Sequence, residues 1–189
     1  CIGAARMREN VRLRGCSRSE NTETDMSARP VLLFDLDGTL VDSVPSLALA
    51  TDRMLQALGR DAAGVSAVRR WVGNGALVLV QRALSGSVTV DESLDSALVE
   101  AALQLFLEYY SECATDGTVL FPEVKQLLEA LALRQLPMAI VTNKPVRFVP
   151  DILRTLAIDS HFDLLVGGDC LSQKKPHPEP LLHAARHFG

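Results

Sequence analysis

Two carboxylates spaced two residues apart follow a short apolar run, and they are the residues best placed to do chemistry. Residues 31–34 read Val-Leu-Leu-Phe, and Asp35 and Asp37 come directly after them. In an extended chain, side chains at positions i and i+2 point to the same side, about 7 Å apart. Gly38 then frees the backbone to turn sharply. The pattern predicts a buried strand that delivers two acidic groups to one point.

The chemistry that suits this pair is phosphoryl transfer. Two converging carboxylates repel each other and an incoming phosphate, unless a divalent cation is bound or one carboxyl keeps its proton. Asp35 can attack phosphorus and split one difficult displacement into two easier ones. Asp37 can give a proton to the leaving oxygen and later take one from water. We expect both aspartates to bind Mg²⁺, which offsets the charge of the phosphoryl group.

A calcium-binding loop is the main alternative for these acidic residues. Such a loop needs further oxygen ligands at alternating positions, and Leu40 and Val41 supply none. We therefore favour catalysis over calcium binding.

The segments around the pair show two kinds of pattern. Residues 30–43 and 117–189 alternate short apolar runs with helical periodicity, whereas residues 44–116 show helix after helix and no strand signal. We expect an α/β fold, a Rossmann-like parallel sheet core with an inserted helical cap. Active sites of such sheets lie at the carboxyl ends of the strands, so the cap would lie over Asp35.

Individual elements can be assigned within these segments. Within residues 44–116, Ser93 is well placed as the N-cap of a helix whose apolar residues fall on one stripe. The expected core strands are residues 31–34, 138–141 and 164–167. The expected core helices are residues 123–133 and 145–156.

Residues 34–40, Phe-Asp-Leu-Asp-Gly-Thr-Leu, resemble the first signature of the haloacid dehalogenase-like hydrolase superfamily. The helical insert that follows resembles that superfamily's cap, and the likeness covers residues 31–189. The resemblance implies Mg²⁺ as cofactor. It also implies a phosphatase or phosphomutase, because Asp37 is an acid where dehalogenases and phosphonate-cleaving relatives have none.

Two later segments resemble the second and third motifs of the superfamily. Thr142 ends an apolar run and, with Asn143, is expected to bind phosphate through its hydroxyl and adjacent N–H groups. The alternative is that either residue only caps the next helix. Lys175 stands immediately before a Pro-His-Pro run, where the superfamily places the lysine that steadies the phosphoryl group and the nucleophile. Lys174 is expected to be a solvated neighbour.

The acidic segment that completes the superfamily's magnesium site is missing. Gly168 and Asp169 imitate its start, but Gln173 stands where a second acid belongs, and Lys175 follows instead of preceding it. We expect a C-terminally truncated fragment that binds magnesium poorly and hydrolyses phosphate esters slowly or not at all. Residues 1–29 are rich in Arg and Ser, and we expect a non-native or disordered extension there.

One segment of the expected cap indicates which substrates the chain can take. Residues 69–75 resemble the cap of bacterial phosphoglycolate phosphatases. A turn at Gly73, Asn74 and Gly75 exposes N–H groups that can seat a substrate carboxylate. Arg82 could add a bidentate contact. The alternative is a tight structural turn with a solvated Arg82.

Composition limits the other classes of function. A formal net charge of −4 gives no basic surface for nucleic acid or membrane. The four cysteines lack C-x-x-C spacing, which is typical of free thiols in a reducing cytosol. We therefore expect a cytoplasmic monomer or homodimer that acts on a small phosphorylated carboxylate.

The resemblance implies hydrolysis of 2-phosphoglycolate to glycolate and phosphate through an aspartyl-phosphate. In the family, this reaction clears phosphoglycolate formed in DNA repair or oxygenation side-reactions. Two alternatives stay open: a sugar phosphomutase, which shares all three motifs, and a non-catalytic binding module that keeps only the fold.

Overall fold

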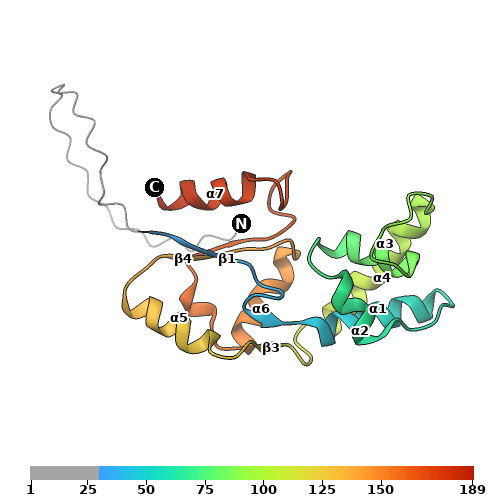
Figure 1. The fold of residues 1–189 in the computed structure, drawn as a ribbon, viewed down its shortest axis with the longest axis horizontal. Coiled ribbons are helices and arrows are strands. Elements are labelled where there is room, and N and C mark those ends of the chain that lie inside the picture. The colour runs from blue at the N-terminus through green and yellow to red at the C-terminus, as the bar shows by residue number, and fades with distance from the viewer. Residues whose placement is uncertain (1–29) are drawn as a thin grey trace, which may run out of the picture.

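The main sheet has three parallel strands in the order β1-β4-β5 in the computed structural model, which describes residues 30–189 (Figure 1). Phe34 lies opposite Ile140, which lies opposite Leu165. The predicted parallel sheet is therefore confirmed, whereas the prediction for residues 1–29 lies outside the described residues. The strands are β1 (Leu32–Phe34), β4 (Met138–Val141) and β5 (Leu164–Val166).

Helices cover both faces of this sheet, with α5 and α6 on one side and α7 on the other (Figure 1). The central strand β4 is buried along its whole length and sends alternate side chains to opposite faces. Met138 and Ile140 pack in one cluster with Leu128, and Ala139 packs in another with Ala184. The helices are α5 (Val124–Leu133), α6 (Val149–Thr155) and α7 (Glu179–Phe188).

The core also contains two short 3-10 helices, one of which takes the place of part of an expected helix. The helix expected over residues 145–156 is divided into η1 and α6, and Pro150 lies in the first turn of α6. The two 3-10 segments are η1 (Val146–Phe148) and η2 (Asp159–His161).

Helices alone build the segment between β2 and β3, with α1 and α4 packed at its centre. Met54 of α1 and Ala102 and Phe106 of α4 are fully or almost fully buried there. The helices are α1 (Val44–Ala57), α2 (Gly64–Trp71), α3 (Ala76–Ser85) and α4 (Ser96–Cys113). Within residues 30–189, none of the helices has the length and apolar character that a membrane span requires.

The N-cap of α4 differs from the expectation. Asp95 occupies that position, and its carboxylate accepts a hydrogen bond from the N–H of Ala97. Ser93 instead donates its hydroxyl to Asp91 in the preceding turn. The prediction of Ser93 as the cap was wrong because Asp and Ser are almost equally good caps, so their types alone do not choose between them.

A two-stranded antiparallel ribbon connects the cap to the core. Its strands are β2 (Val41–Asp42) and β3 (Val119–Leu120). Both passages of the chain between core and cap run through this ribbon, which therefore determines where the cap can lie.

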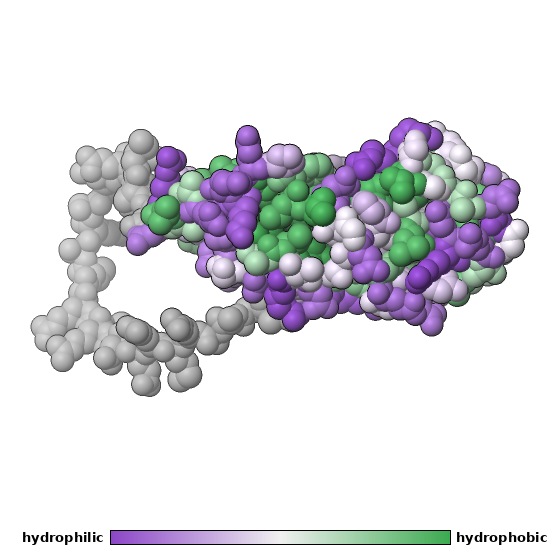
Figure 2. Space-filling model, turned by 90° about the horizontal axis from the view of Figure 1, so that it is seen from below, coloured by the Kyte–Doolittle hydropathy of each residue, from purple (hydrophilic) through white to green (hydrophobic). Residues whose placement is uncertain are grey.

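Viewed from below, the surface mixes polar residues with separate apolar patches (Figure 2). The exposed apolar side chains include Val119 and Leu127.

Candidate active site

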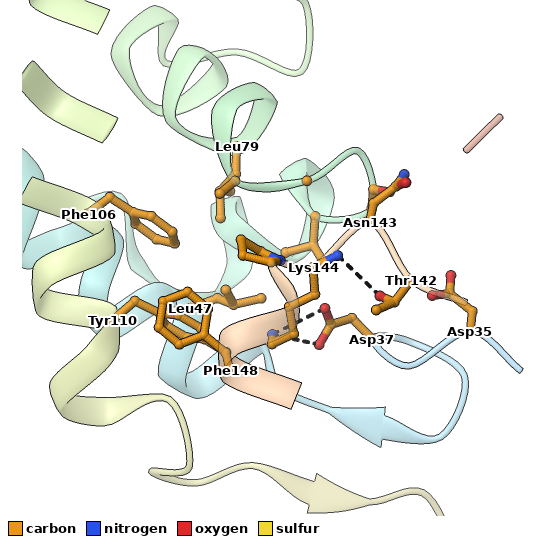
Figure 3. Close-up of a pocket in the computed structure, with 15 residues that line it drawn as sticks. Asp35, Asp37, Leu47, Leu79, Phe106, Tyr110, Thr142, Asn143, Lys144 and Phe148 are labelled. Carbon is orange, nitrogen blue, oxygen red and sulfur yellow. Dashed lines mark hydrogen bonds and ion pairs between the residues drawn. The ribbon is translucent and has the colours of Figure 1, made fainter. Parts of the chain in front are cut away.

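The turn after β1 brings two carboxylates to a pocket that core and cap share (Figure 3). Asp35 and Asp37 both line the pocket, while Leu36 between them is fully buried in the core. The carbonyl of Leu36 accepts hydrogen bonds from the N–H groups of Leu40 and Val41, at 2.9 and 3.1 Å. This tight turn holds the two acids on one side of the backbone.

The Asp35 carboxylate lies beside Lys175. Lys175 Nζ is 3.0 Å from Asp35 Oδ1, and the two side chains are 22% and 40% exposed. The N–H of Leu36 donates to the same oxygen at 2.8 Å. The fold therefore brings together the carboxylate and the lysine that the sequence nominated from opposite ends of the described chain. An ammonium there can neutralise charge on the carboxylate and on a bound phosphoryl group.

The Asp37 carboxylate is held by two other groups. Lys144 Nζ is 3.0 Å from Oδ1 and 3.2 Å from Oδ2, and the Ser43 hydroxyl donates to Oδ1. The side chain of Lys144 is only 3% exposed. Burial lowers the pKa of Lys144, but the neighbouring Asp37 and Tyr110 outweigh burial and leave that pKa raised. Lys144 is therefore a buried cation at neutral pH.

The sequence analysis assigned no role to Lys144. It follows Thr142 and Asn143 at a strand-to-helix junction, a place where a lysine is ordinarily exposed. In the structure it lies beneath the cap, with its Nζ 4.8 Å from the centre of the Tyr110 ring. Residues 142–147 read Thr-Asn-Lys-Pro-Val-Arg, and nothing in this polar stretch distinguishes Lys144 as a buried cation.

Tyr110 of α4 brings a polar group into the same pocket. Its side chain is 1% exposed, and burial raises the pKa of its hydroxyl, an effect that Lys144 partly offsets. Lys144 and Ser46 lie near the hydroxyl, but no described residue makes a hydrogen bond of good geometry with it. The ring is fixed by stacking on Phe106 and by an edge contact with Phe148.

Thr142 and Asn143 lie where β4 ends, and both line the pocket. The N–H of Thr142 continues the sheet by donating to Val166, and its hydroxyl oxygen accepts from the N–H of Lys144 at 3.2 Å. The Thr142 hydroxyl can therefore both close the local turn and donate its own hydrogen to a ligand. This geometry is compatible with both roles considered for Thr142 from the sequence, phosphate binding and capping of the next helix.

Asn143 connects three parts of the molecule. Its side-chain amide donates to the carbonyl of Gly73 in the cap at 3.2 Å and to the carbonyl of Lys175 at 3.1 Å. The oxygen of the same amide is buried and has no hydrogen-bond partner within the described part of the chain. Asn143 thus links the cap turn to the loop that carries the lysine beside Asp35.

The cap turn at residues 73–75 rests on the core. Gly73 and Gly75 line the pocket, and Gly75 has a φ of +88°. A Cβ on Gly75 would lie 3.1 Å from the carbonyl oxygen of Asn143, so this close approach favours glycine. Lys174, expected to be solvated, is partly buried and donates to the carbonyl of Asn74 at 3.2 Å. Two hydrogen bonds therefore hold the turn against the core.

Arg82 is not among the residues that line the pocket. Its guanidinium donates to the carbonyl of Val88 at 2.8 Å and to that of Trp71 at 2.7 Å. These bonds close loops within the cap, at the end of α2 and beyond the end of α3. The geometry favours the structural alternative for Arg82 over a contact with substrate.

The oxygens available for Mg²⁺ are few. Within residues 30–189, no three His, Cys, Asp or Glu side chains gather as a metal site. Both carboxylate oxygens of Asp37 are bound to Lys144, and Asp169 accepts from the N–H of Val146. Protein-bound Mg²⁺ commonly takes one or two carboxylates and completes its shell with substrate phosphate and water. The Asp35 carboxylate and the Asp37 carbonyl fit that minimal arrangement.

Known proteins match this chain over nearly all of the described region. The sequence profile of haloacid dehalogenase-like hydrolases matches residues 32–189. A phosphoglycolate phosphatase of Colwellia psychrerythraea strain 34H is 48% identical over 164 residues, which are 87% of this chain and 73% of that protein. A phosphoglycolate phosphatase of Pseudomonas putida strain KT2440 is 50% identical over 159 residues, which are 84% of this chain and 58% of that protein.

A solved structure agrees with these matches. The crystal structure of a predicted phosphoglycolate phosphatase from Haemophilus somnus 129PT has a TM-score of 0.76 and 36% sequence identity. The match covers 87% of this chain and 73% of that chain. The chain thus spans 58% to 73% of the length of these three relatives.

Proposed function

The chain belongs to the haloacid dehalogenase-like hydrolases, and on that premise we propose that it hydrolyses 2-phosphoglycolate to glycolate and phosphate. The observation that carries the proposal is the position of Asp35. Its half-exposed carboxylate lies beside Lys175 at the mouth of a small pocket that also contains Asp37. The names of the two curated relatives described above support phosphoglycolate as the substrate.

Asp35 acts as the nucleophile in this proposal. One carboxylate oxygen attacks phosphorus, the bond between phosphorus and the glycolate oxygen breaks, and an aspartyl-phosphate forms. Water then attacks the same phosphorus, which releases phosphate and restores the Asp35 carboxylate. The ammonium of Lys175, 3.0 Å from Asp35, stabilises negative charge during both displacements.

Asp37 moves the proton in both steps. It gives a proton to the departing glycolate oxygen and takes one from the attacking water, so it ends the cycle as it began. Ser43 and Lys144 hold its carboxylate in one place, which favours proton transfer along a fixed direction.

Phosphate and metal binding complete the proposed site. Thr142 and Asn143 bind phosphate oxygens, and Gly73 and Gly75 of the cap turn, which line the same pocket, lie against the rest of the substrate. Mg²⁺, when bound by the Asp35 carboxylate and the Asp37 carbonyl, supplies positive charge against the phosphoryl group. The predictions of a cytoplasmic location and of a monomer or homodimer stay predictions.

Phosphate release from 2-phosphoglycolate in the presence of Mg²⁺ tests this function. We expect faster release than from ethyl phosphate, and a beryllium fluoride adduct on Asp35 that mimics the aspartyl-phosphate. Interconversion of sugar phosphate isomers without phosphate release would identify a phosphomutase instead. Ligand binding with neither reaction would identify a binding module.

A further inference from the structure

A buried positive charge lies in the pocket beyond Asp37. Among the described residues that line the pocket, Lys144 is the only basic one. In Figure 3, Asp37 lies between Asp35 on one side and Lys144 with the aromatic residues on the other. A substrate whose phosphorus meets Asp35 and whose ester oxygen meets Asp37 therefore extends its remaining atoms toward Lys144.

The ion pair with Asp37 leaves hydrogen-bond donors near Lys144 that a ligand could use. An ammonium carries three N–H donors; Lys144 directs them at the two Asp37 oxygens, at 3.0 and 3.2 Å, with the Tyr110 hydroxyl oxygen near the same ammonium. The Tyr110 hydroxyl adds a further donor in the same pocket, and it is 1% exposed and without a hydrogen bond of good geometry in the described chain. A buried polar group without such a bond is costly, so an acceptor entering the pocket would be favoured.

The remaining walls select for a small ligand. Most are apolar side chains and glycine backbone, and the free volume is about 40 Å³. A site needs about 10–15 Å³ by this measure to hold one water, so the pocket holds about three waters. The phosphate lies at Thr142 and Asn143 on the wall of the same pocket, so the space left for the rest of the substrate is small and favours a short tail such as CH₂–COO⁻. A sugar would need still more room between core and cap than phosphoglycolate does. The apolar walls are Leu47, Val72, Ala76, Leu79, Phe106, Pro145 and Phe148.

We propose that Lys144, assisted by the Tyr110 hydroxyl, binds the carboxylate of the substrate and determines specificity for a carboxymethyl phosphate. The inference rests on the proposed function and assigns its carboxylate contact to Lys144, a residue outside the cap turn and distinct from Arg82. In phosphoglycolate a single CH₂ separates the ester oxygen from the carboxylate. A group that already touches Asp37 is therefore within reach of that carboxylate.

The competing explanation is that Lys144 only holds Asp37 in place. A positioning role would slow every phosphate ester alike, because Asp37 serves each leaving group. A carboxylate contact would matter only for substrates that carry one. The ratio of two substrates that differ in this group separates the explanations.

The experiment compares 2-phosphoglycolate with ethyl phosphate, which has the same phosphate and a two-carbon chain but no carboxylate. Lys144→Met removes the charge and keeps most of the side-chain length. We expect kcat/KM for phosphoglycolate to fall about ten- to a hundredfold further than for ethyl phosphate, the usual effect of losing a charge-assisted contact. Tyr110→Phe should lower the same ratio about two- to tenfold.

Lys174→Met is the matched control, because Lys174 is also a lysine close to the cap turn, but it lies outside the pocket and contacts the carbonyl of Asn74. It should leave the ratio of the two substrates unchanged. An equal loss on both substrates in Lys144→Met would overturn the inference. If Lys144→Met does not fold, Tyr110→Phe decides, because it keeps the ring that packs against Phe106, and an unchanged ratio there would be fatal to the inference.

A binding measurement separates this inference from the proposed function. Calorimetry on Asp35→Asn, with and without Lys144→Met, compares the affinities for the two ligands without turnover. Preference for phosphoglycolate that disappears with Lys144→Met supports the carboxylate site even if the chain releases no phosphate. Equal affinities for both ligands, or binding of neither, would overturn it, whatever the phosphatase assay shows.

Discussion

Two carboxylate–lysine pairs lie side by side at the end of β1, and they differ mainly in burial. Asp35 with Lys175 and Asp37 with Lys144 both have a closest N–O distance of 3.0 Å. The side chains of the first pair are 40% and 22% exposed, whereas those of the second are 15% and 3% exposed. The two pairs therefore have the same residue types and the same N–O distance, but the first is in contact with water and the second is largely shielded from it.

The cap causes this difference. Lys175 belongs to the loop before α7, whereas Lys144 lies beneath Tyr110 of α4. An exposed pair contributes little to stability and can rearrange when a ligand arrives. A buried pair is fixed, and loss of one partner leaves a charge away from water. The comparison assigns the first pair to the reacting phosphate and the second to proton transfer and the far end of the substrate, where the groups must stay in place.

The largest expected effect is on the exposed pair. Asp35→Asn is nearly isosteric but removes the anionic nucleophile, so we expect turnover of 2-phosphoglycolate to fall more than about a thousandfold. Thermal unfolding should change little, because this carboxylate is half exposed. Steady-state phosphate release and circular dichroism measure the two effects. Activity above a thousandth of the unsubstituted chain would contradict the covalent mechanism.

Asp37→Asn tests the catalytic side of the buried pair. General acid–base catalysis is worth about a hundred- to ten-thousand-fold, and we expect kcat to fall by that amount. Stopped-flow measurement should show slower release of glycolate and slower breakdown of the aspartyl-phosphate. A rise in KM with kcat unchanged would assign Asp37 to binding instead.

Stability provides the most direct contrast between the two lysines. Lys144→Met should lower the free energy of unfolding by about 3–5 kcal/mol, because it leaves the Asp37 carboxylate without its buried partner. Lys175→Met is the matched control and should change it by at most about 1 kcal/mol. Urea denaturation, analysed with the same m-value for both variants, measures both changes in the free energy of unfolding. Equal losses would mean that burial does not distinguish the pairs.

The buried pair should also make stability fall at high pH. The pKa of Lys144 is raised in the folded state, so its contribution is complete below the unfolded value of about 10.4 and is lost as pH rises through the higher folded value. The raised pKa of Tyr110 acts in the same direction. We expect a loss of up to about 1.4 kcal/mol per pH unit for each group between its two pKa values.

Denaturation between pH 9 and pH 12 tests this dependence. The fall should be smaller in Lys144→Met and unchanged in Lys175→Met. A pH profile that Lys144→Met leaves intact would mean that other groups cause the fall.

The smallest effect is expected at Arg82, which lies outside both pairs. Arg82→Met removes hydrogen bonds to Trp71 and Val88, so the free energy of unfolding should fall by about 1 kcal/mol for each bond. The values of kcat/KM for 2-phosphoglycolate and ethyl phosphate should change alike. A loss selective for phosphoglycolate would restore Arg82 as a substrate contact and weaken the assignment to Lys144.

The sequence by itself determined the parallel α/β architecture and nominated the reacting residues. The i, i+2 spacing of Asp35 and Asp37 after an apolar run is a local pattern, because strand geometry alone puts both side chains on one side. The apolar run before Thr142 likewise identified β4. These features depend only on neighbours along the chain, and resemblance to a family then supplied Lys175.

Only the tertiary structure decided which charges are buried. Lys144 is a cation beneath the cap because Tyr110 and Asp37, 34 and 107 positions away, fold against it. The short ribbon of β2 and β3 has too few residues to produce a periodic signal, and Arg82 found acceptors within the cap instead of in the pocket. Burial, pairing and pKa depend on contacts between distant segments, and the pattern along one segment does not contain them.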